Sequence, residues 1–169
     1  FESGGHIRRR AGILYPDIQF HFLPLAISYD GKKDAGTHGF QVHVGTKRAK
    51  SRGWVRLKSN NPLDPPKVRF NYMTDPQDWI DMRACITLTR EIFRQPAFSS
   101  FIGSEIAPGE SCNTNDLMDI FIKEKVESAY HPCGTCRMGD DDSAVVDPLT
   151  MKAKGLDGLF IVDSSVMPQ

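Results

Sequence analysis

The chain has 169 residues, of which 21 are Lys or Arg and 21 are Asp or Glu, so its formal net charge is zero. This length allows one domain with a hydrophobic core. A zero net charge favours no nucleic-acid partner, and no apolar run approaches the about 20 residues that a membrane-spanning helix needs. The four cysteines do not form the pattern of a secreted disulfide framework. We therefore expect a reducing compartment and a protein that is not secreted.

The first half of the chain alternates between apolar and polar residues, as β-strands do. In residues 15–29, Phe20 and Phe22 flank His21, so the histidine is expected on the opposite face of a strand from the two rings. Three more short strands are expected where similar runs recur, in residues 39–46, 53–59 and 67–72. Together these runs predict a mainly antiparallel sheet within about residues 15–72.

Two helices are expected after this sheet. Asp75 followed by Pro76 is typical of a helix start, with an N-cap and a proline at the first helical position. The first helix is expected over residues 76–95, with an apolar surface so wide that much of it must be buried. A second helix is expected over residues 114–128, and short strands and turns are expected after it. The predicted fold class is α+β, with both helices covering one side of the sheet.

The stretch YHPCGTCRMG, residues 130–139, holds a C-x-x-C pair and a histidine. A redox dithiol favours a thiol at a helix N-terminus, whereas this pair follows a predicted helix and contains Gly134. A zinc site needs about four ligands, and the sequence has no second C-x-x-C. From the residues alone, a dithiol, half of a zinc site and a loop whose important residue is His131 all stay open, and the loop is favoured.

The motif HPCGTCRMG, followed by VVDPLTMKAKGLDGLFIVDSSVMP, resembles the C-terminal signature of the glucose–methanol–choline flavin oxidoreductases. The resemblance continues through SRGWVRLKSNNPLDPP, FNYMTDPQDW, TREIFRQPAF and EIAPG, and it covers the chain from about Tyr15 onward. It is strongest to the choline-oxidising members, which share YPDIQFHFLP and HPCGTC. In the family the positions of Cys133 and Cys136 vary while the histidine is constant. The resemblance thus implies that these thiols only pack and that no metal is bound.

The resemblance implies an FAD-dependent oxidoreductase that acts on the CH–OH group of an alcohol. Choline would become betaine aldehyde, the route to glycine betaine, by hydride transfer to FAD. His131 would be the catalytic residue that accepts the hydroxyl proton. His21 and Tyr130 would line the substrate pocket; their alternative roles are an exposed strand residue and a packed aromatic. Asp163 and Ser164 in VDSS would contact FAD.

The resemblance also implies that residues 1–169 are one substrate-binding, C-terminal domain of a longer enzyme. The FAD-binding domain is expected elsewhere, because no G-x-G-x-x-G follows a strand in this sequence. A second catalytic residue, His or Asn, is expected after the last residue. This piece alone is expected to be inactive, and its uncovered apolar surface is expected to favour self-association.

Three further expectations concern the whole enzyme. Its electrons are expected to pass to oxygen or to a respiratory quinone. Its location is expected to be the cytoplasm or the surface of the inner membrane. The alternatives are another primary-alcohol dehydrogenase or oxidase of the same family, a thiol-redox or zinc-binding module, and a non-catalytic binding domain.

Overall fold

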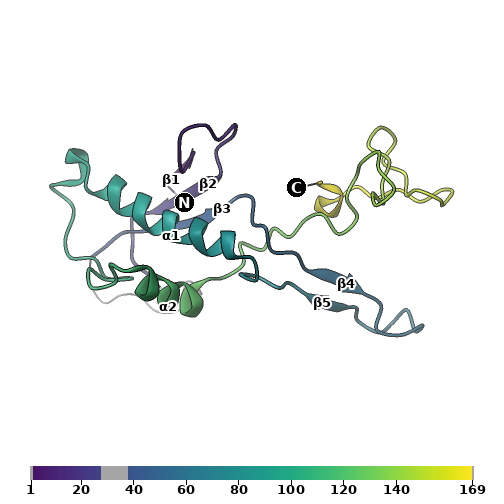
Figure 1. The fold of residues 1–169 in the computed structure, drawn as a ribbon, viewed down its shortest axis with the longest axis horizontal. Coiled ribbons are helices and arrows are strands. Elements are labelled where there is room, and N and C mark those ends of the chain that lie inside the picture. The colour runs from purple at the N-terminus through teal and green to yellow at the C-terminus, as the bar shows by residue number, and fades with distance from the viewer. Residues whose placement is uncertain (1, 28–37, 169) are drawn as a thin grey trace. The chain divides into compact units, whose positions relative to one another are not determined.

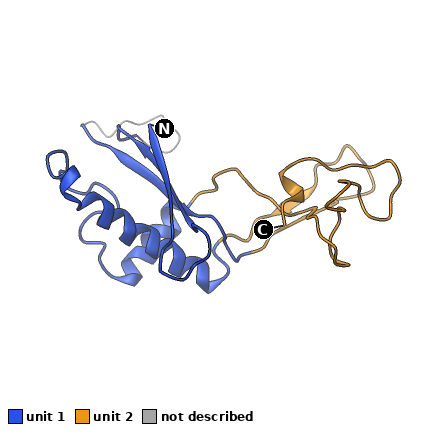
Figure 2. Cartoon of the chain, turned by 90° about the horizontal axis from the view of Figure 1, so that it is seen from above, with its two compact units in different colours: residues 1–51, 73–126 blue, residues 52–72, 127–169 orange. Residues whose placement is uncertain are grey.

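The computed structural model describes residues 2–27 and 38–168, which form two compact units (Figures 1 and 2). Each unit is made of two stretches of the chain: residues 1–51 and 73–126 form unit 1, and residues 52–72 and 127–169 form unit 2. The assignment of residues 1–169 to one domain of a longer enzyme stays a prediction.

Unit 1 contains a three-stranded antiparallel sheet in the order β1-β2-β3 (Figure 1). Its strands are β1 (Ser3–Ile7), β2 (Ile18–Leu23) and β3 (Gln41–Thr46). β2 is shorter than the strand predicted over residues 15–29, the last two of which lie outside the described residues. β1 was not predicted, because its sequence SGGHI contains two glycines and only one residue, Ile7, that favours strands.

The two helices of unit 1 begin where the sequence predicts. Helix α1 (Pro76–Phe93) follows Asp75, whose side chain accepts a hydrogen bond of 2.8 Å from the backbone nitrogen of Gln77. Helix α2 (Asn115–Lys125) follows Thr114, whose hydroxyl caps the helix in the same way. A short helix, η1 (Pro96–Phe98), lies between them.

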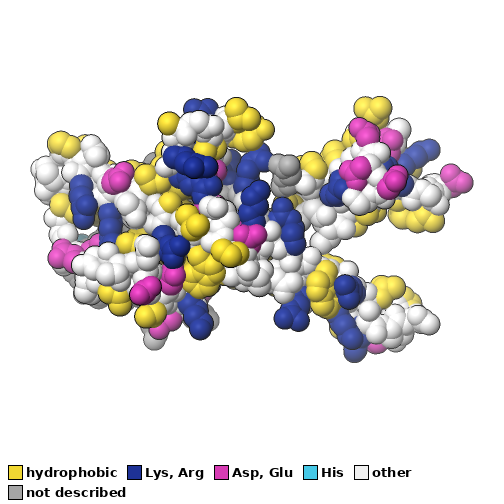
Figure 3. All heavy atoms as spheres, viewed as in Figure 1, with side chains coloured by type: hydrophobic (Ala, Val, Ile, Leu, Met, Phe, Trp, Pro, Cys, Tyr) yellow, Lys and Arg dark blue, Asp and Glu magenta, His cyan; other side chains and the backbone are white. Residues whose placement is uncertain are grey.

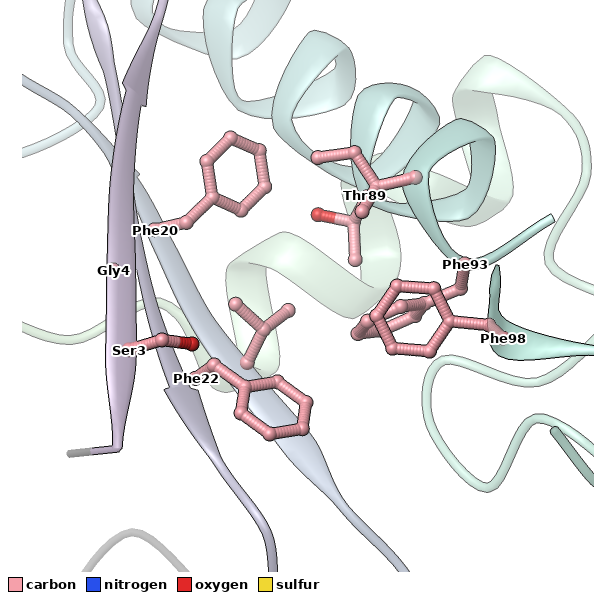
Figure 4. Close-up of a pocket in the computed structure, with 9 residues that line it drawn as sticks. Ser3, Gly4, Phe20, Phe22, Thr89, Phe93 and Phe98 are labelled. Carbon is pink, nitrogen blue, oxygen red and sulfur yellow. The ribbon is translucent and has the colours of Figure 1, made fainter. Parts of the chain in front are cut away.

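Helix α1 is buried on two sides, as its wide apolar surface predicts. One side packs on the sheet in a cluster built around Ile18, Phe20 and Cys85. The other packs against α2 in a cluster built around Ile86, Cys112, Met118 and Ile122. Between the sheet and α1 lies a cavity of about 260 Å³, where Phe20 and Phe22 of β2 face Phe93 and Phe98 (Figure 4).

The side chain of Asp78, in the first turn of α1, is almost fully buried. Its carboxylate accepts hydrogen bonds from the backbone nitrogens of Lys50, at 2.6 Å, and Ser51, at 3.0 Å, and another from the Ser51 hydroxyl. A buried carboxylate is tolerated only with such partners. These hydrogen bonds connect residues 50–51, after β3, to the first turn of α1.

Unit 2 holds the strands that the sequence analysis assigned to the same sheet. β4 (Trp54–Arg56) and β5 (Lys67–Arg69) form an antiparallel pair of their own. The single sheet expected over residues 15–72 is therefore two separate sheets. The α+β class with antiparallel sheets is confirmed.

Turns make up much of the later part of unit 2, as the sequence predicts. The short strands expected there are, among the described residues, only isolated bridges, and one short helix, η2 (Ser164–Val166), is present. Val146 is central, because it bridges to both Met138 and Ala153 and is fully buried.

On the face seen in Figure 3, basic and acidic side chains are interspersed. Within the described ranges, no helix is long and apolar enough to cross a membrane.

Candidate active site

The loop of residues 131–139, which carries HPCGTCRMG, is hydrogen-bonded to the turn of residues 163–166. The backbone nitrogens of Cys136 and Met138 donate to the carbonyl oxygens of Ser165, at 3.0 Å, and Val166, at 2.8 Å. The hydroxyl of Ser164 also reaches the carbonyl of Pro132, at 3.4 Å. Two motifs about 30 residues apart in the sequence, one predicted to be catalytic and one to bind the cofactor, thus form one structure within unit 2.

A tight turn presents His131 at the start of this loop. Tyr130 has a φ of 59°, a conformation that is unfavourable for a bulky aromatic residue. Its backbone nitrogen donates to the Ser128 hydroxyl at 3.0 Å, and Ser128 also accepts a hydrogen bond from the Tyr72 hydroxyl at 3.1 Å. Ser128 therefore holds the strained turn in place.

The loop needs glycine at position 134. Gly134 has a φ of 89°, in the region that residues with side chains rarely adopt. A Cβ atom there would lie 3.4 Å from the Met167 carbonyl oxygen.

His131 and Tyr130 are both exposed, so an imidazole and an aromatic ring are open to a ligand. An imidazole can accept a proton near neutral pH.

The residues predicted to contact the cofactor lie at the start of η2. Asp163 caps this turn, its carboxylate accepting a hydrogen bond of 2.8 Å from the backbone nitrogen of Ser165. Hydrogen bonds from the hydroxyl and the backbone of Ser165 hold the pKa of Asp163 below its usual range. The exposed carboxylate of Asp163 offers hydrogen-bond acceptors, which fits a ligand that carries hydroxyl groups.

The four cysteines have free thiols in two kinds of environment. Cys85 is buried in α1, and burial raises the pKa of its thiol to about 12, which makes it inert. Cys136 is half-buried, but Cys133 is exposed, so the expectation that both C-x-x-C thiols pack is wrong for Cys133 within this chain. Among the described residues, no group of three or more His, Cys, Asp or Glu side chains could hold a metal ion.

Replacing both thiols of the C-x-x-C pair tests whether they take part in chemistry. In the whole protein, the double change Cys133→Val, Cys136→Val is expected to leave flavin reduction by substrate nearly unchanged, because the loop is held by backbone hydrogen bonds. The free energy of unfolding should fall by less than about 1.5 kcal/mol. A well-folded, flavin-loaded double variant that fails to reduce its flavin would establish a redox dithiol.

His21 lies in unit 1, at the centre of the sheet. It is half-buried on β2, directly opposite His43 of β3. The alternation along β2 places it on the face opposite Phe20 and Phe22, as predicted. The apolar cavity of Figure 4 lies on the face of the phenylalanines and is lined by other residues than His21. The structure thus brings Tyr130, the His131 loop and Asp163 together in unit 2 and places His21 in unit 1.

Three polar residues around these candidates are not among the residues predicted from the sequence. Ser128 accepts a hydrogen bond from the backbone nitrogen of Tyr130 and so holds the turn before His131. A serine two residues before a turn residue is the sequence pattern that could have indicated this role. His43 and Gln41 lie on the same face of the sheet as His21. They could be recognised only once the strand register was known, because alternation alone does not say which residues of two strands are opposite.

Comparison with known proteins defines the class. The model of a family described as GMC oxidoreductase matches residues 49–169. The chain belongs to the GMC oxidoreductase family. The match includes both the His131 loop and the Asp163 turn, and it confirms the resemblance inferred from HPCGTCRMG and VDSS.

Curated proteins with similar sequences include members of this family that are named for one substrate. Oxygen-dependent choline dehydrogenases of Brucella ovis (strain ATCC 25840 / 63/290 / NCTC 10512) and Sinorhizobium medicae (strain WSM419) are each 56% identical to the chain over 100% and 99% of its length. The chain spans 31% of each of these proteins.

Solved structures share the fold. The crystal structure of pyridoxine 4-oxidase from Mesorbium loti is similar over 98% of this chain and 33% of its own, with a TM-score of 0.82 and 30% identity. A formate oxidase of Aspergillus oryzae RIB40 is similar over 92% of this chain and 28% of its own, with a TM-score of 0.77. The latter is 24% identical, and the likeness concerns the fold alone.

Proposed function

We propose that the chain is the substrate-side part of an FAD-dependent dehydrogenase that oxidises choline to betaine aldehyde. The observation that carries this proposal is the hydrogen-bonded pairing of the His131 loop with the Asp163 turn in a chain of the GMC family. The substrate is inferred from relatives that are 56% identical and are named choline dehydrogenases.

His131 is assigned the proton-transfer role. Oxidation of an alcohol carbon removes a hydroxyl proton and a hydride, and the remaining C–O bond becomes a carbonyl. The imidazole of His131, presented by the turn at Tyr130, accepts the hydroxyl proton. When FAD is bound, its isoalloxazine ring is the acceptor that this chemistry requires for the hydride.

Asp163 and Ser164 are assigned to the cofactor side of the same site. Both are exposed, and the Ser165 hydrogen bonds lower the pKa of Asp163 and so favour its ionised form. This arrangement suits the ribityl hydroxyls of a flavin nucleotide, which can donate to a carboxylate. The formate oxidase of similar fold has an FAD.

Two residues are assigned to the choline itself. Tyr130 is 73% exposed, and its ring face can contact a quaternary ammonium, an interaction of about 0.5–2 kcal/mol. His21, on the polar face of the sheet, is assigned to the substrate pocket. Oxygen is proposed as the electron acceptor, because the relatives are named oxygen-dependent.

A comparison of alcohols tests this function in the whole protein. We expect kcat/KM for choline to exceed that for pyridoxine and for the uncharged isostere of choline, in which carbon replaces the quaternary nitrogen. Oxygen consumption should accompany turnover with choline. Faster turnover of an uncharged alcohol than of choline would assign the protein to another GMC activity, and turnover with a quinone but not with oxygen would correct the acceptor.

A further inference from the structure

The polar face of the sheet in unit 1 has a second histidine beside His21. His43 of β3 is directly opposite His21 of β2, so their side chains lie on the same face. Both are half-buried. The other described histidine of this face is His6 on β1, which is opposite Gln19, two residues from His21 along β2. Its Nδ1 lies 3.4 Å from the Lys47 ammonium. Helix α1 packs against the opposite face of the sheet.

Gln41 determines which ring nitrogen of His43 carries the proton. The backbone nitrogen of Ile27 donates to the Gln41 side-chain oxygen at 2.9 Å. The amide oxygen is therefore on the Ile27 side, and the amide NH₂ group faces Nε2 of His43, at 2.9 Å. An NH₂ group can only donate, so Nε2 must accept and His43 must be the neutral tautomer with its proton on Nδ1.

Two effects oppose the protonation of His43: the hydrogen bonds of Gln41, and the surroundings of the His43 ring. A proton on Nε2 would point at the Gln41 NH₂ group, and flipping the amide would instead turn that group against the Ile27 N–H. Burial lowers the pKa of His43, and the neighbouring His21 lowers it further. The neutral form is thus maintained to lower pH than in an ordinary histidine.

We propose that Gln41 determines specificity by keeping His43, directly opposite His21, uncharged, so that a cationic alcohol can bind beside His21. This inference rests on the proposed choline oxidation. A charged His43 would repel a quaternary ammonium and would have little effect on an uncharged alcohol of the same shape. The role therefore predicts a selective effect on choline against its carbon isostere.

The test uses the whole flavin-loaded protein and the ratio of kcat/KM for choline to that for the carbon isostere. His43→Lys, which places a permanent charge opposite His21, is expected to lower this ratio at least about 10-fold. His43→Gln is the neutral matched variant and should change both substrates alike. An unchanged ratio in His43→Lys, or an equal fall in His43→Gln, would overturn the proposal.

A second variant covers the case in which His43→Lys fails to fold. Gln41→Met removes the amide and lets Nε2 of His43 take a proton, so the pKa of His43 rises. The choline-to-isostere ratio should then begin to fall at a higher pH than in the wild type as the solution is acidified. The same pH dependence in both proteins would contradict the proposal.

The tautomer can be measured without turnover. Ring-nitrogen chemical shifts of labelled histidine, with His43→Gln identifying the His43 signals, should show Nδ1 protonated and Nε2 unprotonated at neutral pH. A doubly protonated ring would refute the inference by itself. If the tautomer is as expected but wild-type protein oxidises neither alcohol, the proposed function fails and the Gln41–His43 geometry stands.

Discussion

Replacing His131 by alanine in the whole protein is expected to lower kcat for choline by at least about 10²-fold, the usual contribution of a general base. The reason is that no imidazole would remain at the start of the loop to take the hydroxyl proton. The expected loss is in kcat, measured by steady-state oxygen consumption, while the flavin content should stay at the wild-type level because the 131–139 loop is held by its backbone.

His38→Ala serves as the matched control. His38 is also exposed and has no part in the proposed site, so its removal should leave kcat unchanged. If the His131→Ala protein turned over choline at the wild-type rate, His131 would be removed from the mechanism. A fall in flavin content that accounts for the lost activity would assign His131 a structural role instead.

Asp78→Ala should produce a large loss of stability in unit 1. It would leave the partly buried backbone N–H groups of Lys50 and Ser51 without the carboxylate that accepts their hydrogen bonds at 2.6 Å and 3.0 Å. Each unsatisfied donor costs about 1–3 kcal/mol, so the free energy of unfolding should fall by about 3 kcal/mol. Urea denaturation would measure it, with Trp79 as the reporter of unit 1 in a Trp54→Phe background.

Asp119→Ala is the comparison for this measurement. Asp119 pairs with Arg83 at 2.8 Å, and its side chain is 34% exposed, so the change should cost less than about 1 kcal/mol. Equal urea midpoints for the Asp78 and Asp119 variants would show that the Asp78 hydrogen bonds do not stabilise unit 1 as the structure indicates.

Local signals in the sequence were sufficient for the helices. Asp75 and Pro76 marked the start of α1, and a wide apolar surface predicted its burial, because caps and helical periodicity act within a few residues. The same local reasoning placed His21 opposite Phe20 and Phe22. It failed for β1, which is a strand because β2 offers it a partner rather than because SGGHI favours one.

The arrangement of the candidate site depends on contacts between distant segments. The pairing of Cys136 with Ser165 joins residues 29 positions apart, and no local pattern encodes it. The division into two sheets depends on which strands pair, and alternation within each strand does not reveal this pairing. The family resemblance, rather than periodicity, identified His131 and Asp163, and Gln41 and His43 emerged only from the register of β2 and β3.

The central claim is that this chain serves choline oxidation through a bound flavin, and anaerobic reduction measures it most directly. Whole protein mixed with choline in the absence of oxygen should lose its oxidised-flavin absorbance in one turnover, more slowly when the alcohol carbon carries deuterium, and much more slowly in the His131→Ala variant. Flavin that stays oxidised with choline but is reduced by another alcohol would contradict the claim.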